Sequence, residues 1–339
     1  MAKFIAPASI DDYRTLAKKR LPRQFFDYLE GGSYAEQTCR DNISAFGQVH
    51  LRQRVLKDVS QRDLSTTILG QQYAMPIVLG PVGLAGLNAR RGEVQAARAA
   101  KQAGVKVLVF TVDLAVLGAR YRDVRHGIAG DSGLRAKLAK IADILTHPQW
   151  LWDVPIQGKP LVFGNLAAAV PGAKSLPAFK QWVDEQFDPA VTWDDLAWLR
   201  EHWSGKIVLK GILDSEDARM AANLGFDAII VSNHGGRQLD SVDASIHALP
   251  QCVEAVAGRC EVLVDGGIRS GLDVVKALAL GANGCLLGRA WAYGLAARGE
   301  QGVSEVLTIL RAEMDVAMAL TGCRTLADIN PDILVPTSP

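Results

Sequence analysis

The feature that most constrains the fold is a repeated alternation between short apolar runs and alanine-rich amphipathic segments. Six apolar runs occur, at residues 76–83, 105–113, 206–213, 228–233, 261–267 and 285–288. Amphipathic segments at 92–104, 215–225 and 272–281 are predicted to be helices. The runs are continuously apolar, as expected for strands that are buried on both faces of a parallel sheet. The pattern therefore predicts an α/β fold, a TIM-type (β/α) barrel.

Two stretches fall outside this alternation, although the chain is predicted to be a single domain over residues 1–339. Residues 1–70 are predicted to be an N-terminal segment of helices and connecting loops. Residues 118–205 are predicted to be a long insertion, in which Trp150 and Trp152 lie among prolines and glycines. The insertion is expected either to touch a membrane interface or to fold onto its own barrel.

Composition disfavours several classes of protein. The 37 basic and 36 acidic residues nearly cancel, so no basic face for nucleic acid is expected. The 5 cysteines are scattered without a C-x-x-C pair, which argues against a disulfide framework or a zinc site and fits a reducing cytoplasm. The N-terminus has no apolar signal core, and no stretch approaches the ~20 apolar residues of a spanning helix. The protein is expected to be cytoplasmic, either soluble or attached peripherally to a membrane.

Polar side chains gather at the carboxyl ends of the apolar runs, the end of an α/β barrel that carries the active site. They are Thr111, Asp113, Lys210, Asn233, His234 and Asp265. The most informative segment is SNHGGRQLD, in which His234 and Arg237 follow a buried strand. An arginine can anchor a carboxylate while a nearby histidine takes a proton, which suits chemistry on a hydroxy acid. The two glycines between them allow a sharp turn and the close approach of a planar ligand.

The loops after the last two runs predict a phosphate site. Gly266 and Gly267 open into a helix, and Gly288 follows the next run. Barrels often hold a phosphate at these loops through backbone N–H groups and a helix N-terminus, and Arg269 and Arg289 are placed to add positive charge. No strand–GxGxxG–helix fingerprint occurs, so a monophosphate such as FMN fits better than a nicotinamide dinucleotide.

Two further charged residues end apolar runs. Lys210 follows apolar residues, and a lysine that faces a barrel mouth indicates an anionic ligand. Asp113 is placed either to orient a histidine or to cap a helix.

Several motifs in the same order resemble the FMN-dependent α-hydroxy-acid oxidases and dehydrogenases. The motifs are DYLEGG, LRQRVLKDVS, PVGLAG, FTVD followed by GARYRD, LKGIL, SNHGGRQLD, and DGGIRSG followed by GR. The resemblance covers nearly the whole chain and is greatest to membrane-associated bacterial members that oxidise L-lactate to pyruvate. It implies transfer of electrons to a quinone or another respiratory acceptor, at the cytoplasmic face of the inner membrane. It also implies a homo-oligomer, commonly a tetramer.

The resemblance implies a role for each matching residue. His234 corresponds to the catalytic base and Asp113 to its carboxylate partner. Tyr28, Arg120 and Arg237 correspond to residues that hold the substrate carboxylate. The residues expected to contact FMN are Gly83, Thr111, Lys210, Ser232, Asp265, Gly266, Gly267, Arg269, Gly288 and Arg289.

The chain departs from the family by two βα units. In relatives these units separate the first apolar run from the second, whereas here the segment 92–104 leads directly into the second run, so only six of eight units are evident. The missing units carry two contacts to flavin, whose loss would weaken FMN binding about thirty-fold. Six strands must close more tightly than eight or remain open. An oxidase that uses oxygen directly and a degenerate barrel without turnover stay open as alternatives.

Overall fold

The centre of the molecule is a six-stranded parallel sheet with the order β3-β8-β7-β6-β5-β4. This computed structural model describes residues 6–84, 88–89, 107–126, 133–158 and 188–336. The strands are β3 (Ile77–Leu79), β4 (Val107–Thr111), β5 (Lys206–Ile212), β6 (Ala228–Val231), β7 (Glu261–Val264) and β8 (Gly284–Leu287). The first five lie within predicted apolar runs, and β8 begins one residue before the run 285–288. Both β6 and β8 are buried along their whole length. The prediction of an α/β fold with six parallel strands is confirmed.

Within the part of the chain that the structure describes, the sheet is open between β3 and β4. Among the described residues, β3 pairs with β8 alone and β4 with β5 alone, so these two strands form the edges. The opening lies at the place where the sequence lacks two units. The six strands therefore remain as a curled, open sheet and do not close more tightly. The predicted helix at 92–104 lies outside the described residues.

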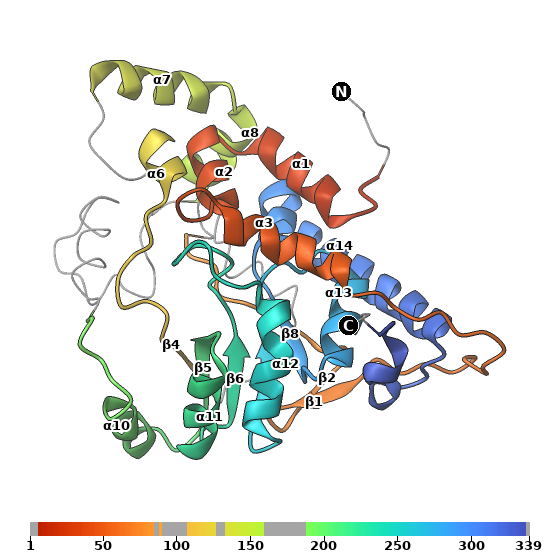
Figure 1. The fold of residues 1–339 in the computed structure, drawn as a ribbon. Coiled ribbons are helices and arrows are strands. Elements are labelled where there is room, and N and C mark those ends of the chain that lie inside the picture. The colour runs from red at the N-terminus through yellow and green to blue at the C-terminus, as the bar shows by residue number, and fades with distance from the viewer. Residues whose placement is uncertain (1–5, 85–87, 90–106, 127–132, 159–187, 337–339) are drawn as a thin grey trace.

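Helices follow the last strands and cover the sheet (Figure 1). They are α11 (Ser215–Asn223), α12 (Ser245–Val256), α13 (Gly271–Ala279) and α14 (Arg289–Thr321), followed by the short turns η3 (Leu326–Asp328) and η4 (Pro331–Ile333). Asp214 caps α11, and Ser270 forms a capping box with Asp273 at the start of α13. The predicted helices at 215–225 and 272–281 are thus confirmed.

The N-terminal segment lies across the carboxyl ends of the strands (Figure 1). It contains α1 (Ile10–Arg20), α2 (Arg23–Glu30), α3 (Gln37–Ser44) and the 3-10 turn η1 (Ala45–Gln48). The end of this segment differs from the prediction, because β1 (Thr66–Ile68) pairs antiparallel with β2 (Gln71–Tyr73). The hairpin packs Ile68 into a small core with side chains of β5, β6, β7 and β8. It thereby closes the amino end of the sheet.

The insertion folds partly onto the N-terminal helices. Its described elements are α6 (Tyr121–His126), α7 (Leu134–Leu145), α8 (Pro148–Leu151), the π-helical turn η2 (Trp152–Ile156) and α10 (Asp195–His202). Trp150 is 4% exposed and stacks on Phe25 with ring centroids 4.7 Å apart. Trp152 is 61% exposed. Trp150 therefore packs against α2, whereas Trp152 is exposed. None of the described helices is long and apolar enough to cross a membrane.

Candidate active site

His234 and Asp113 meet at the carboxyl end of the sheet. His234 follows β6 and Asp113 follows β4, and the Nδ1 atom of His234 lies 2.9 Å from Oδ1 of Asp113. Gly211 permits this approach, because its φ is 108° and a Cβ atom there would lie 2.6 Å from Cβ of Asp113. The contact leaves Nε2 as the imidazole nitrogen that can exchange a proton with a ligand.

Lys210 is a buried cation with two partners. The residue is 3% exposed, and its Nζ atom lies 2.8 Å from Oγ of Ser232 and 2.9 Å from Oδ2 of Asp265. Thr111 is its neighbour in the register of β4 with β5. The second carboxylate oxygen of Asp265, Oδ1, is buried and has no hydrogen-bond partner among the described residues. A buried acceptor of this kind is suited to a hydroxyl donor from a ligand.

Arg237 is half-buried between α2 and the loop after β6. Its Nη1 atom donates to the carbonyl oxygens of Tyr28 at 2.7 Å and Gly31 at 2.8 Å, and its guanidinium lies 4.9 Å from the centroid of the Tyr28 ring. Burial and the neighbouring Arg120 lower the pKa of Arg237 to about 10, so it stays charged at neutral pH. A Cβ atom on Gly83 would lie 3.0 Å from the Tyr28 hydroxyl. The structure therefore brings together the four predicted residues Tyr28, Gly83, Arg120 and Arg237.

The loops after β7 and β8 contain glycines at close approaches. Gly266 and Gly267 have φ values of 95° and 83°, and a Cβ atom on Gly267 would lie 1.7 Å from the carbonyl oxygen of Asn42. Gly288 directly precedes α14, and a Cβ atom there would meet nothing within 4 Å. Open space beside the N-terminus of a helix suits a phosphate, because free N–H groups and the helix dipole attract anions.

The two arginines predicted near this phosphate site contact protein groups. Arg289 donates to the carbonyl oxygens of Leu29, Glu30, Gly31 and Gly235 at 3.2, 3.1, 2.8 and 2.8 Å. The guanidinium of Arg269 lies 5.7 Å from the Tyr293 ring centroid, and its Nη1 atom donates to the Ile268 carbonyl. Arg289 thus holds the end of α2 against the loop after β6. Contact of either arginine with a phosphate stays a prediction.

Two residues that hold the His234 loop in place, Gln238 and Asn42, are not predicted from the sequence. Gln238 donates to the carbonyl oxygens of Asp113 at 2.8 Å and Val116 at 2.7 Å, and so joins the loops after β4 and β6. Asn42 of α3 is hydrogen-bonded to Asn233. Gln238 lies inside SNHGGRQLD, so its place in that motif is a signal that could have identified it. Nothing in the sequence around Asn42 connects that residue with the motif.

Glu30, at the end of α2, joins three helices and gives the fold a predicted acid sensitivity. Its carboxylate accepts hydrogen bonds from Arg14 at 2.8 and 2.6 Å and from the Tyr293 hydroxyl at 2.6 Å. Burial acts to raise the pKa of Glu30, but hydrogen bonds from Arg14 and Tyr293 outweigh it and hold the pKa below the ordinary 4.5. A lowered carboxylate pKa stabilises the fold above the ordinary value, and this contribution disappears as the pH falls through the folded-state pKa.

We therefore expect Glu30→Gln to reduce the loss of thermal stability between about pH 6 and about pH 3.5. The measurement is the unfolding midpoint at each pH, by circular dichroism. Glu254→Gln, at an exposed position of α12, serves as the control. It should lose as much thermal stability between the two pH values as the parent does. An equal fall of the unfolding midpoint on acidification in Glu30→Gln and in the parent would contradict the prediction.

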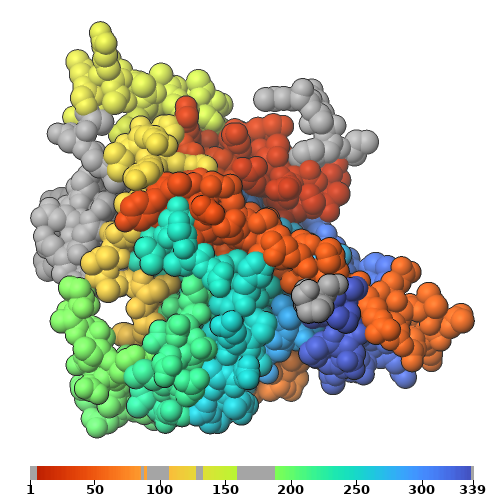
Figure 2. Space-filling view, in the orientation of Figure 1, coloured from red at the N-terminus to blue at the C-terminus, as the bar shows by residue number. Residues whose placement is uncertain are grey.

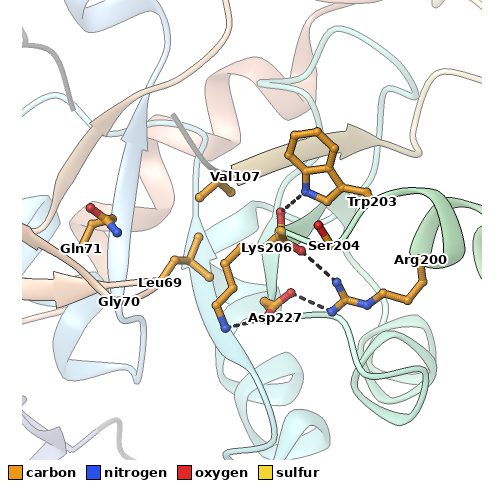
Figure 3. A pocket seen from close by; sticks show the side chains of 10 residues that line it. Leu69, Gly70, Gln71, Val107, Arg200, Trp203, Ser204, Lys206 and Asp227 are labelled. Atoms are coloured by element: carbon orange, nitrogen blue, oxygen red, sulfur yellow. Dashed lines mark hydrogen bonds and ion pairs between the residues drawn. The ribbon is translucent and has the colours of Figure 1, made fainter. Parts of the chain in front are cut away.

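A cleft of about 550 Å³ lies at the opposite end of the sheet (Figure 3). It is lined by Leu69, Gly70, Gln71, Val107, Arg200, Trp203, Ser204, Gly205, Lys206 and Asp227. Arg200 and Lys206 both bind Asp227, at 2.8 and 2.7 Å. These charges compensate one another, and the cleft lies at the amino ends of β4 and β5, away from His234. We therefore place the candidate active site at the carboxyl end.

Comparison with known proteins identifies relatives over nearly the whole length of the chain. A family model described as FMN-dependent dehydrogenase matches residues 17–106 and 98–336. The L-lactate dehydrogenase of Caulobacter vibrioides is 46% identical over 380 aligned positions, which cover 98% of each protein. That of Pectobacterium atrosepticum is 45% identical over 372 positions, covering 96% of each. The crystal structure of the monotopic membrane protein (S)-mandelate dehydrogenase matches with a TM-score of 0.90 and 35% identity, over 98% of this chain and 100% of that one.

These matches also bear on the missing units. The family match divides into two stretches that meet at residues 98–106, between the positions of β3 and β4. The alignment with the Caulobacter protein spans 380 positions, more than the 339 residues of this chain, so the relative contains residues without a counterpart here. Both findings agree with the loss of a segment at the open side of the sheet. The chain belongs to the FMN-dependent dehydrogenase family.

Proposed function

We propose that this protein oxidises L-lactate to pyruvate and passes the electrons through FMN to a quinone or another respiratory acceptor. The observation that carries the proposal is the His234–Asp113 pair, 2.9 Å apart at the sheet end that also holds Lys210 and Arg237. A base, a carboxylate-binding arginine and a buried cation are the groups that oxidation of a hydroxy acid requires. The similarity to bacterial L-lactate dehydrogenases favours lactate among the 2-hydroxy acids.

The roles of the polar residues follow from their positions. Arg237, with Tyr28 and Arg120, would bind the substrate carboxylate and so orient the hydroxyl-bearing carbon. His234 would take a proton at Nε2, and Asp113 would stabilise the imidazolium that forms. A base at this position serves oxidation by hydride transfer and oxidation through a carbanion equally.

The residues present fit FMN, which supplies the two-electron acceptor when bound. The unpartnered Oδ1 atom of Asp265 would accept a hydrogen bond from a ribityl hydroxyl. The open space beside Gly288 would take the phosphate at the N-terminus of α14. Lys210 would place its charge against the flavin ring, with Thr111 and Ser232 next to it. Gly83, Gly266 and Gly267 would let the backbone approach the cofactor.

We further propose that the protein attaches to the membrane surface through α7. Leu134, Leu138, Ile141 and Leu145 form one stripe of this helix and are 54–74% exposed. Arg135, Lys137 and Lys140 add positive charge, which favours anionic lipid. Figure 2 shows the yellow-green helix standing out from the body of the molecule. The structural similarity to a monotopic membrane protein supports this proposal.

Leu138→Glu is expected to weaken binding to vesicles that contain anionic lipid by about tenfold or more. The change removes apolar area that the lipid would bury, and it adds a negative charge that anionic lipid repels. Co-sedimentation with vesicles measures the effect. Ala136→Glu adds the same charge to an exposed position on the opposite side of α7 and is the matched control. Equal weakening in both variants would assign the effect to net charge alone and contradict the role of the apolar stripe.

The experiment that tests the proposed function is an anaerobic visible spectrum of the FMN-loaded protein before and after addition of L-lactate. Bleaching of bound flavin supports the dehydrogenase, and subsequent rapid reoxidation by oxygen rather than by a quinone would instead indicate an oxidase. The opening between β3 and β4 favours a second candidate, a barrel scaffold without turnover. A protein that does not retain FMN would support that candidate and overturn the enzymatic proposal.

A further inference from the structure

Two buried asparagine side chains join the N-terminal segment to the end of β6. Nδ2 of Asn42 donates to Oδ1 of Asn233 at 2.8 Å, and Nδ2 of Asn233 donates to Oδ1 of Asn42 at 2.8 Å. The two residues are 2% and 7% exposed. A reciprocal pair of this kind fixes the orientation of both amides, because turning either one would place two donors and two acceptors face to face.

Asn233 also holds the turn that carries His234 and the later part of the same loop. Its Oδ1 atom accepts the N–H of Gly236 at 3.1 Å, and its Nδ2 atom donates to the carbonyl of Asp243 at 2.9 Å. His234, Gly235 and Gly236 all have left-handed backbone conformations, with φ values of 56°, 64° and 71°. Such a conformation is unfavourable for a residue with a side chain, so His234 keeps it only because surrounding contacts enforce it.

Asn42 also contacts the loop that follows β7. A Cβ atom on Gly267 would lie 1.7 Å from the carbonyl oxygen of Asn42, and one on Gly266 would lie 3.4 Å from its Oδ1 atom. The same Oδ1 atom accepts the N–H of Ser245, the first residue of α12, at 3.1 Å. One residue of α3 thus touches both the loop of the proposed base and the loop proposed to approach FMN.

We propose that Asn42 is a positioning residue, which sets the orientation of His234 relative to Asp113 and to the Gly266–Gly267 loop. This inference rests on the proposed function, since it assigns α3 a part in the same site. Asn42 contacts neither His234 nor Asp113 itself and acts through Asn233. Exchange of its amide for a carboxylate therefore disturbs the His234 turn without removing any group proposed to touch substrate.

Asn42→Asp preserves size and keeps the oxygen that accepts from Ser245, but it replaces the donor to Asn233 with an acceptor. Thr38→Val is the matched control. Thr38 lies in the same helix, is 0% exposed, and exchanges hydrogen bonds with Val242 rather than Asn233. Both variants lose contacts between α3 and the long loop after β6, so both should lower the thermal midpoint. Only Asn42→Asp should alter His234. Asn42→Ser is measured beside them in case the carboxylate prevents folding.

The first readout is the imidazole signal of His234 in protein labelled with ¹⁵N-histidine and free of FMN. This signal is identified among the 6 histidines by its absence in His234→Asn. In the parent and in Thr38→Val we expect a proton held on Nδ1 by Asp113. In Asn42→Asp and Asn42→Ser we expect a mixture of Nδ1 and Nε2 tautomers. Identical imidazole signals in all folded variants would overturn the proposal and leave Asn42 with a structural role only.

The second readout is flavin reduction by L-lactate in the FMN-loaded protein. Loss of a hydrogen bond in a buried polar network corresponds to about tenfold in rate, and we expect this fall in kcat with KM changed less than about threefold. Thr38→Val should match the parent. If the parent does not bind FMN, the proposed function fails, while the FMN-free NMR comparison still decides the role of Asn42.

Discussion

Reduction of bound flavin by L-lactate is expected to slow by about 10²–10⁴-fold when His234 is replaced by Asn, because the proton loses its acceptor. Asparagine preserves approximate size at a position whose left-handed φ of 56° it tolerates better than most residues. The backbone turn should therefore persist, and the change isolates the chemistry of the imidazole. Anaerobic stopped-flow absorbance of the flavin gives the rate directly.

Two further variants test whether the slower reduction is specific to the His234–Asp113 pair. Asp113→Asn keeps a polar neighbour 2.9 Å from Nδ1 but removes the negative charge, so its rate should fall between those of the parent and His234→Asn. His247→Asn alters an exposed histidine of α12 and should leave the rate unchanged. A His234→Asn protein that retains FMN and bleaches at the parental rate would show that another group removes the proton.

Lys210→Met is expected to lower the free energy of unfolding by about 3–5 kcal/mol and to abolish FMN binding. The lysine is 3% exposed, and its removal leaves the Asp265 carboxylate buried without the cation 2.9 Å away. The same substitution removes the charge proposed to lie against the flavin. Urea denaturation measures the first effect, and quenching of FMN fluorescence measures the second.

A double variant tests whether the unpaired carboxylate of Asp265 causes the loss of stability. Adding Asp265→Asn to Lys210→Met removes the uncompensated charge, so most of the stability should return while FMN binding stays lost. Lys206→Met is the matched control, because Lys206 lies on the same strand and also pairs with an aspartate, but its side chain is 51% exposed. It should cost no more than about 1 kcal/mol. Equal destabilisation by Lys206→Met and Lys210→Met would contradict the argument from burial.

The parallel core could be predicted from sequence because its strands are continuous apolar runs. The polar residues that end those runs, among them Asp113, Lys210 and His234, then share one edge of the sheet by geometry alone. The hairpin at 66–73 was missed because its strands are three residues long, too short for a period to show. The single-domain organisation and the tetramer stay predictions.

Other parts of the site depend on contacts between segments far apart in the chain. Asn42 and Asn233 are 191 residues apart, and no local pattern marks either as a partner of the other. The different environments of Trp150 and Trp152 depend on whether Phe25 of α2 lies within reach. Such pairings are set by tertiary packing, which a periodicity of two or 3.6 residues does not encode.

The pairing of β3 with β8 has a consequence for synthesis on the ribosome. Ile77 of β3 lies beside Cys285 of β8, about 200 residues later in the chain. At the usual 5–20 residues per second, β3 waits roughly 10–40 s for its only described neighbour to be made. In a chain with the two missing units, a neighbouring strand would emerge far sooner. The N-terminal part of the chain therefore exposes the apolar run 76–83 for most of translation. The yield of folded protein in cells should depend on chaperones that shield such runs.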